Sequence, residues 1–419
     1  MQKKNTLSFE YALKNSRPAA FSSMVKPAGS LCNLDCHYCY YLDKSTIYNH
    51  KQPLMSDELL EKYICQYIEA NEVSKVIFLW HGGEPLMQNI DFYKKAMLFQ
   101  KKYSSGKEIE NLIQTNGTLL TEEWCKFFAK NNFLVGLSID GPKDIHDSFR
   151  MNKAGKPSFD RVIKGVNLLK QYKVEFNTLT VVNKLSESRG AEVYQFLKSI
   201  GSRYMQFLPA VEHIIYSESS ARPAIVSPDT PNAVLAQWSV SAAGYGKFLI
   251  DIFDYWILND VGETFVQIFD STLAQYCGVN PGLCIMNETC GDALIIEHNG
   301  DVYPCDHFVY PEYLLGNIMQ NHLSEIFKSQ KRYDFGMKKR GTLSQKCLRC
   351  EYLNLCWGEC PKHRFESNLR NDFRENSLCE GLKEFFRHSK PYMEYMRDLL
   401  VIGKPPAEVM SWEYNDKKE

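Results

Sequence analysis

The chain contains 419 residues with a formal net charge of −1, 44% hydrophobic residues and 24% charged residues. A charge so close to zero gives no reason to expect binding to nucleic acid or to a membrane surface. There is no apolar run long enough to span a bilayer, and the first residues lack the apolar core of a signal peptide. We therefore expect a cytoplasmic protein, in which 14 cysteines indicate metal or cluster ligation rather than disulfides.

Between residue 21 and about residue 210, short β-rich runs alternate with amphipathic helical patterns. The expected strands are Phe21–Val25, Val76–Leu79, Asn111–Gln114, Leu134–Ile139, Val174–Val182 and Tyr204–Leu208. The expected helices are Ser56–Asn71, Asp91–Tyr103, Thr121–Asn131, Phe159–Tyr172 and Ala191–Ile200. Six β/α units in sequence predict an α/β fold with a parallel sheet that curls into a partial (β/α)6 TIM-like barrel. In such folds the chemistry gathers at the carboxyl ends of the strands.

A loop with three cysteines follows the first expected strand. Cys32, Cys36 and Cys39 have the spacing CxxxCxxC. Three thiolates in eight residues all turn inward only if the backbone wraps around something, and a soft metal centre is the usual reason. Zinc normally takes four protein ligands, whereas three thiolates suit a [4Fe–4S] cluster with one open iron. Zinc and coincidence stay open as alternatives on this pattern alone.

Polar and glycine-rich segments follow the next three expected strands. They are His81-Gly82-Gly83-Glu84-Pro85, Gln114-Thr115-Asn116-Gly117, and Ser138-Ile139-Asp140-Gly141-Pro142 with Arg150 shortly after it. Paired glycines allow a backbone to approach a ligand closely, and a Glu carboxylate accepts from an ammonium group. Each segment alone is also typical of an ordinary βα turn. Their succession beside a three-cysteine loop favours a binding site.

The second half of the chain is less regular until cysteines return. Residues 211–275 include a helical, aromatic run, Phe248–Phe269, and are either a surface insertion with a packing helix or a lid or substrate groove. A hairpin is expected from Leu294–Glu297 and Val302–Tyr303 around an Asn-Gly turn. A helix is expected over Leu382–Leu400, as a structural cap.

Eight cysteines in this half divide into two sets of four. They are Cys284, Cys290, Cys305, Cys347, Cys350, Cys356, Cys360 and Cys379. This spacing is equally typical of zinc ribbons and of iron–sulfur sites. Cys65 and Cys125 lie in expected helices and are interpreted as buried core thiols, and Cys277 also stands apart from the motifs.

With these motifs assembled, the chain resembles the radical S-adenosylmethionine (SAM) superfamily, and its second half resembles the SPASM auxiliary-cluster domain. The most similar family is that of the anaerobic sulfatase-maturating enzymes. The motifs that carry the resemblance are the three-cysteine loop, the three strand-end segments, Tyr303-Pro304-Cys305-Asp306 and the array from Cys347 to Cys379. The expected domains are residues 1–240 (partial barrel), 241–276 (connecting helical segment), 277–382 (SPASM domain) and 383–419 (C-terminal helix and tail).

The resemblance implies SAM and three [4Fe–4S] clusters as cofactors. Cys32, Cys36 and Cys39 would hold the cluster that binds SAM. The first auxiliary cluster would be held by Cys284, Cys290, Cys305 and Cys360, and the second by Cys347, Cys350, Cys356 and Cys379. Full ligation by four cysteines suits electron relay rather than substrate binding. Cys277 competes with Cys284 for one position, and the spacing to Cys290 favours Cys284.

The resemblance also assigns the side chains around SAM. The implied SAM-binding residues are His81, Gly82, Gly83, Glu84, Asn116, Ser138, Arg150 and Leu208. His81 departs from the Gln that is common in the family, so its contact with SAM is left open. The alternative for Arg150 is a surface ion pair with Asp147.

Two further residues are assigned to catalysis and substrate. Asp306, next to a cluster ligand, matches the family's proposed base, and a carboxylate suits proton removal. Its alternative is a turn residue that bonds backbone amides. Tyr41 is assigned to the peptide site, with aromatic packing as the alternative.

The function implied by the resemblance is oxidation of an active-site Cys or Ser of a sulfatase to Cα-formylglycine. The expected partners are an unfolded or nascent sulfatase polypeptide and a low-potential electron donor such as flavodoxin or ferredoxin. One alternative is a SPASM-type enzyme that forms thioether or carbon–carbon crosslinks in a ribosomal peptide. Another is a structural zinc protein without catalytic activity.

Overall fold

The computed structural model describes residues 20–412, apart from residues 42–43, 45–46, 48–53, 217–221 and 366–374. All six expected strands are present, with ends that differ by a few residues. They are β1 (Ser22–Lys26), β2 (Lys75–Trp80), β3 (Glu108–Thr115), β4 (Leu134–Ser138), β5 (Phe176–Val182) and β6 (Tyr204–Pro209). The alternation of β-rich and amphipathic runs therefore predicted the barrel.

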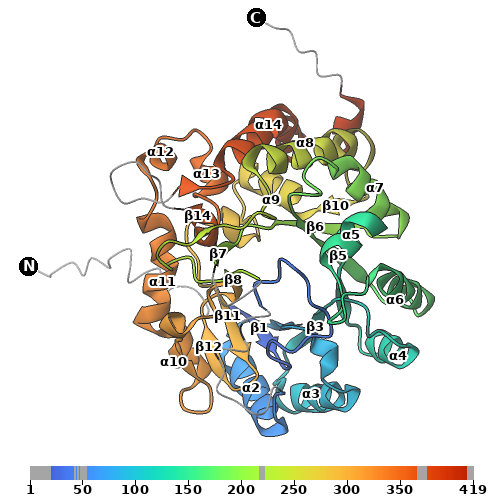
Figure 1. Cartoon of the computed structure of the whole chain (residues 1–419), viewed down its shortest axis with the longest axis vertical. Coiled ribbons are helices and arrows are strands. Elements are labelled where there is room, and N and C mark those ends of the chain that lie inside the picture. Colours follow the sequence, from blue (N-terminus) through green and yellow to red (C-terminus); the bar gives the residue numbers. More distant parts are fainter. Residues whose placement is uncertain are drawn as a thin grey trace, which may run out of the picture.

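The expected helices cover the outside of these strands (Figure 1). They are α2 (Asp57–Ala70), α3 (Ile90–Tyr103), α4 (Glu122–Lys130), α6 (Phe159–Gln171) and α7 (Gly190–Ser199). Hydroxyl caps fix two of the starts: Ser56 accepts from the amide of Leu59, and Thr121 accepts from that of Trp124. A further helix, α5 (Lys143–Phe149), was not predicted.

One sheet of ten strands runs through the described chain. Its order is β10-β6-β5-β4-β3-β2-β1-β11-β12-β13, and all pairings from β10 to β11 are parallel. Because β10 and β13 form two separate edges, the barrel is partial, as expected. β11 (Ala293–Glu297) pairs in parallel with β1 and places Glu297 opposite Lys26. The cysteine-rich half therefore continues the barrel sheet directly.

The segment before the cysteine-rich half contains two helices. These are α8 (Ala242–Asn259) and α9 (Gln267–Tyr276), with the short strand β10 (Phe265–Val266) just before α9. The prediction of one helical run over Phe248–Phe269 is therefore wrong. Gly262, three residues after the end of α8, has a φ of +84°, a left-handed conformation that interrupts the helical run and that glycine adopts without a steric cost. A small three-stranded sheet consists of β7 (His213–Ile215), β8 (Ala224–Ile225) and β9 (Val234–Leu235).

The cysteine-rich half consists of the expected hairpin and short helices. β12 (Asp301–Tyr303) pairs antiparallel with β11, which confirms the hairpin, and β13 (Gly316–Asn317) follows. The helices are α10 (Leu323–Lys328), α11 (Gln330–Gly341), α12 (Gln345–Leu348) and α13 (Leu353–Cys356). A two-stranded sheet of β14 (Arg364–Phe365) and β15 (Glu375–Asn376) comes next.

The terminal helix α14 (Cys379–Val401) packs along α8, and the two lie side by side in Figure 1. A Cβ atom on Gly246 would lie 2.5 Å from the carbonyl oxygen of Gly381. Only glycine allows the two helices to approach this closely. α14 begins at Cys379, so this contact fixes the position of a predicted cluster ligand. Within the described residues, no helix is long and apolar enough to cross a membrane.

Candidate active site and cluster sites

The three-cysteine loop lies at the carboxyl end of β1. The thiols of Cys32 and Cys36 both interact electrostatically with that of Cys39, and Cys36 interacts with Cys32 as well. Burial raises the pKa of the Cys36 thiol far above its usual value, while the neighbouring Arg150 guanidinium acts in the opposite direction. The three thiols thus form one group, and such a group of soft donors fits a [4Fe–4S] cluster.

The paired glycines after β2 pack directly against this loop. The amide of Gly83 donates to the carbonyl oxygen of Gly29 at 2.8 Å, and that of Glu84 donates to Leu31 at 2.9 Å. A Cβ atom on Gly82, whose φ is +123°, would lie 2.9 Å from the Gly29 oxygen. These glycines therefore allow the second strand end to lie against the cysteine loop.

The carboxylate of Glu84 is fully buried and holds two strand ends together. It accepts hydrogen bonds from the hydroxyl of Thr115 at 2.7 Å and from the amides of Asn116 at 2.8 Å and Leu86 at 3.1 Å. Burial raises the pKa of this carboxyl to about 7, and these donors act in the opposite direction. The contacts give Glu84 a role in fastening β2 to β3, while its predicted contact with SAM stays a prediction.

Asn116 and Ser138 lie at the next two strand ends. The side-chain amide nitrogen of Asn116 donates to the side-chain oxygen of Asn33 at 2.9 Å and lies 3.7 Å from the sulfur of Cys32. The hydroxyl of Ser138 accepts from the side-chain amide of Gln114 at 3.0 Å. Asn116 therefore orients the cysteine loop from β3, and Ser138 has a second lone pair for a ligand hydroxyl.

Arg150 forms a buried ion pair, although not with the residue considered from the sequence. Its Nε donates to the Asp140 carboxylate at 3.0 Å, and its guanidinium lies 5.5 Å from the centroid of the Tyr38 ring. Asp147 instead accepts the amides of Ser158 and Phe159, so the alternative of a surface pair with Asp147 is wrong. The predicted SAM contact of Leu208 stays a prediction: it lies on β6 opposite Val181 and is 38% exposed.

Asp306 lies between the cysteine loop and the cysteine-rich half. Its carboxylate accepts from the ammonium of Lys26 on β1 and from the hydroxyl of Tyr40. Burial alone raises the pKa of this carboxyl, but the charges of Lys26, His81 and His307 more than offset it and hold the pKa well below its usual value. These contacts are to side chains, so the alternative of a turn residue bonded to backbone amides does not describe Asp306.

The neighbours of Asp306 include residues that sequence reasoning missed. Lys26 is fully buried, and Lys362 and Glu212, whose charged groups are 2.6 Å apart, are also buried. The Lys362 ammonium lies 4.6 Å from the centroid of the Tyr40 ring. The one sequence signal for Lys26 was a lysine at the end of an apolar strand, three residues before the Gly29-Ser30 turn of the cysteine loop. The pair of Lys362 and Glu212 left no recognisable pattern in the sequence, because 150 residues separate them.

Tyr41 is 3% exposed, and its hydroxyl donates to the Glu297 carboxylate. The Lys26 ammonium lies 3.5 Å from the centroid of its ring. These contacts favour the packing interpretation of Tyr41 and leave Tyr40 as the tyrosine that reaches Asp306.

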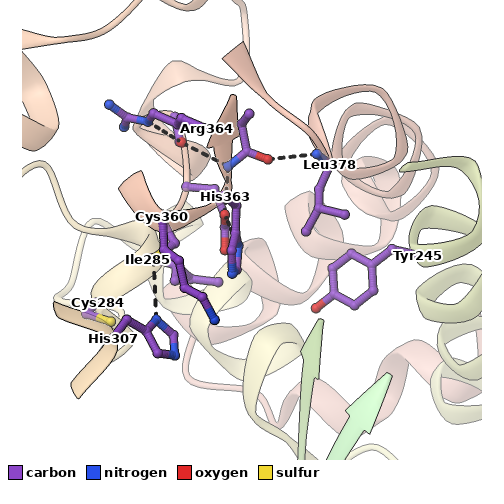
Figure 2. A network of polar contacts seen from close by, with 12 residues as sticks. Tyr245, Cys284, Ile285, His307, Cys360, His363, Arg364 and Leu378 are labelled. Atoms are coloured by element: carbon purple, nitrogen blue, oxygen red, sulfur yellow. Dashed lines mark hydrogen bonds and ion pairs between the residues drawn. The ribbon is translucent and has the colours of Figure 1, made fainter. Parts of the chain in front are cut away.

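The four cysteines predicted for the first auxiliary cluster come together. Cys360 interacts electrostatically with Cys284, Cys290 and Cys305. In Figure 2, Cys360 lies beside His307, whose Nδ1 is 3.8 Å from the Cys360 sulfur. Cys277 interacts instead with Arg397 on α14, which supports Cys284 over Cys277 as a ligand.

The other four cysteines line a cavity of about 290 Å³. Its walls include Cys347, Cys350, Cys356 and Cys379. Cys356 interacts electrostatically with both Cys347 and Cys379. An open space lined by four thiols fits a bound iron–sulfur cluster, and it corresponds to the second predicted ligand set. Of the remaining thiols, Cys125 is buried as expected, whereas Cys65 is only half-buried and donates to Glu69.

Comparison with known families agrees with this arrangement. Residues 27–197 match the radical SAM superfamily, and residues 284–351 match SPASM, an iron–sulfur cluster-binding domain. The chain is thus a radical SAM enzyme with a SPASM domain.

More specific relatives cover nearly the whole chain. It is 49% identical to the serine-type anaerobic sulfatase-maturating enzyme of Bacteroides thetaiotaomicron, over 92% of this chain and 94% of that protein. It is 35% identical to the cysteine-type enzyme of Clostridium novyi, over 91% and 98% respectively. A solved structure of native anSMEcpe with bound AdoMet and Cp18Cys peptide matches with a TM-score of 0.78 and 32% identity, over 90% of this chain and 99% of that one. The chain belongs to the family of anaerobic sulfatase-maturating enzymes.

Proposed function

We propose that this enzyme oxidises the side chain of a serine or cysteine in a sulfatase to Cα-formylglycine. The observation that carries the proposal is the position of Asp306, a buried carboxylate in contact with Lys26 and Tyr40 beside the cysteine loop. The relatives named serine-type and cysteine-type sulfatase-maturating enzymes support this substrate class.

The cofactors of this reaction are SAM and three [4Fe–4S] clusters, held by the three-cysteine loop and by the two sets of four cysteines. When bound, they supply a 5′-deoxyadenosyl radical that takes a hydrogen atom from the substrate Cβ, and they accept the one electron that remains. The chain's own side chains bind SAM and the peptide, and they remove the proton.

The base is Asp306. Removal of a hydrogen atom, a proton and an electron converts the serine side chain to an aldehyde, and Asp306 takes the proton from the substrate hydroxyl or thiol. For cysteine the product is a thioaldehyde, which hydrolysis converts to formylglycine. Lys26 and Tyr40 orient the carboxylate, since each contacts a different oxygen of it.

Residues at the carboxyl ends of the strands would hold SAM. Gly82 and Gly83 permit close approach of its methionyl part, and Arg150 contributes a guanidinium, a group that suits carboxylates. The other contacts come from His81, Glu84, Asn116, Ser138 and Leu208. The support for these assignments is that the residues follow successive strands β2, β3 and β4, with Leu208 on β6.

The polypeptide substrate is an unfolded or nascent sulfatase, and the electron donor is a low-potential carrier such as flavodoxin or ferredoxin. Residues 328–349 support an acidic carrier, because they contain eight Lys and Arg residues and one acidic residue, Asp334. Lys338 and Arg349 are exposed on this segment, close to the second auxiliary site. α11 and α12 of the segment lie at the outer edge of the molecule in Figure 1.

The test uses anaerobically reconstituted protein, SAM, a strong reductant and a peptide with a Cys-x-Pro-x-Arg motif. Parallel peptides carry Ser or Ala in place of the Cys. Mass spectrometry follows the peptide, and chromatography follows 5′-deoxyadenosine. We expect formylglycine in step with deoxyadenosine for Cys or Ser and none for Ala. Deoxyadenosine with an unchanged Cys and Ser peptide, or a crosslinked product, would instead favour a SPASM-type crosslinking enzyme.

A further inference from the structure

A tight turn joins the two auxiliary cluster sites. Cys356 belongs to the second ligand set and Cys360 to the first, and only Trp357, Gly358 and Glu359 separate them. These three residues have φ values of 47°, 69° and 51°, so all of them adopt the left-handed conformation. Non-glycine residues adopt it at a cost, and three in succession persist only when the surroundings hold them.

One buried side chain holds the carbonyl groups of this turn. Arg364 is 4% exposed, and its guanidinium donates to the carbonyl oxygens of Trp357 and Gly358, both at 3.1 Å. A further nitrogen of the same group donates to the carbonyl oxygen of Lys339 at 2.9 Å and to the hydroxyl of Thr342 at 3.0 Å. Arg364 therefore ties the turn to the end of α11 through a planar, rigid fork of donors.

A second group of contacts fixes the other side of the turn. Asn376 donates to the carbonyl oxygen of Gly358 at 3.2 Å and to the Glu359 carboxylate at 2.7 Å. The Nδ1 of His363 also lies 2.7 Å from that carboxylate. Figure 2 shows Arg364, His363 and Cys360 within this one polar network.

The charge of Arg364 faces both ligand sets. It interacts electrostatically with Cys347 of the second set and with Cys360 and Cys290 of the first. Reduction makes an iron–sulfur cluster more negative, and the net charge and hydrogen bonds around a cluster set its reduction potential. A buried cation next to both sets would therefore favour the reduced form of both clusters.

We propose that Arg364 is a positioning residue that holds the turn between the two auxiliary clusters and that its charge raises the reduction potential of both. The proposal rests on the two ligand sets of the proposed function, and it assigns one residue to both of them. Lys339 provides a contrast, because its ammonium contacts the carbonyl oxygens of Cys284 and Ile285 at the first site only.

The test is a redox titration of the reconstituted protein, followed by electron paramagnetic resonance without SAM or peptide. The variants are Arg364→Gln and Arg364→Lys, with Lys339→Met and the surface change Arg189→Gln for comparison. In Arg364→Gln we expect the ratio of reduced to oxidised cluster at the wild-type midpoint to fall at least tenfold at both auxiliary sites. This equals about 59 mV for a one-electron couple. Lys339→Met should lower the reduction potential of the first auxiliary cluster only, and Arg189→Gln should change neither potential.

Unchanged potentials at both auxiliary sites in Arg364→Gln, with full iron content, would overturn the proposal. If Arg364→Gln does not retain its clusters, the test depends on Arg364→Lys, because lysine keeps the positive charge but lacks the planar set of donors. The ratio of reduced to oxidised cluster in Arg364→Lys should then stay within threefold of wild type at both auxiliary sites. A tenfold fall would contradict the role of the charge. Because the titration uses no peptide, its result is independent of whether the peptide assay gives formylglycine.

Discussion

The ammonium group of Lys26 on β1 contacts the carboxylate of Asp306, which lies 280 residues further along the chain. Lys26 also faces Glu297 across the β1–β11 pairing, and Glu297 accepts from the hydroxyl of Tyr41. A buried lysine needs such partners, because an unpaired charge is costly away from water. The barrel and the SPASM half therefore meet at a buried polar network, and the proposed base is part of that network.

We expect Lys26→Met to lower the rate of formylglycine formation by at least a hundredfold. Removal of one partner of a buried ion pair costs about 3–5 kcal/mol, and the remaining Asp306 carboxylate would lose its fixed position. The SAM site keeps its own contacts, so reductive cleavage of SAM without peptide should persist. The measurement is the ratio of formylglycine to 5′-deoxyadenosine over time.

Lys198→Met is the matched control, because Lys198 forms a 2.6 Å ion pair with Asp260 on the helical side of the barrel. This variant should have the same ratio of formylglycine to 5′-deoxyadenosine as wild type. A Lys26→Met enzyme with a normal ratio would show that Asp306 does not depend on the lysine.

Tyr40 and Tyr41 are adjacent, yet we expect their phenylalanine variants to behave differently. Tyr40→Phe removes a hydrogen bond to the Asp306 carboxylate, and bonds to charged groups contribute about 1.5–3 kcal/mol, so kcat should fall about tenfold or more. Tyr41→Phe removes a donor from buried Glu297, whose second oxygen has no hydrogen-bond partner among the described residues, and should lower the unfolding free energy by about 1–3 kcal/mol.

Kinetics with the peptide and thermal unfolding of both variants distinguish these outcomes. A Tyr41→Phe enzyme of normal stability with raised KM would restore the interpretation of Tyr41 as a peptide contact. Normal kcat in Tyr40→Phe would remove Tyr40 from the active site.

The sequence predicted the barrel well because its signals are local. Alternating apolar residues and hydroxyl caps lie within each element, as Ser56 and Thr121 illustrate. The parallel pairing of β11 with β1 was not predictable, since it joins residues about 270 apart and leaves no local pattern. The sequence did not predict the ion pairs of Arg150 with Asp140 and of Lys26 with Asp306, because the fold determines which charged side chains meet.

Loss of a single auxiliary ligand should remove one cluster. We expect Cys379→Ala to lower the iron content from roughly twelve to roughly eight per chain, since the second set would retain three cysteines and, unlike the three-cysteine loop, has no SAM to complete the ligation of the fourth iron. Cys379 also begins α14, so the Tm of the reconstituted protein should fall with the cluster. Iron analysis and the visible spectrum after anaerobic reconstitution check both effects.

Cys65→Ala is the control for this experiment. Its thiol donates to Glu69 on α2, outside both ligand sets, so the iron content should equal that of wild type. An unchanged iron content in Cys379→Ala would exclude Cys379 as a ligand.

His146 should make the protein less stable in mild acid. Burial lowers the pKa of this imidazole to about 4, whereas an unfolded histidine has a pKa of about 6.5. Between these values the unfolded chain binds more protons than the folded one, so the free energy of unfolding decreases as the pH falls from about 6.5 to about 4. The total loss from this residue is at most about 3 kcal/mol. Above about pH 6.5 His146 is neutral in both states, so this loss of unfolding free energy is absent.

His146→Gln removes the titration, so its Tm should fall less than that of wild type between pH 7.5 and pH 5. Ser158→Ala is the matched control, because Ser158 lies 3.0 Å from the His146 ring nitrogen and its loss leaves the imidazole in place. That variant should keep the pH dependence of wild type at a lower Tm. Comparison of variants at each pH cancels contributions from the clusters, which all three proteins share. Parallel pH profiles for His146→Gln and wild type would show that another group causes the acid sensitivity.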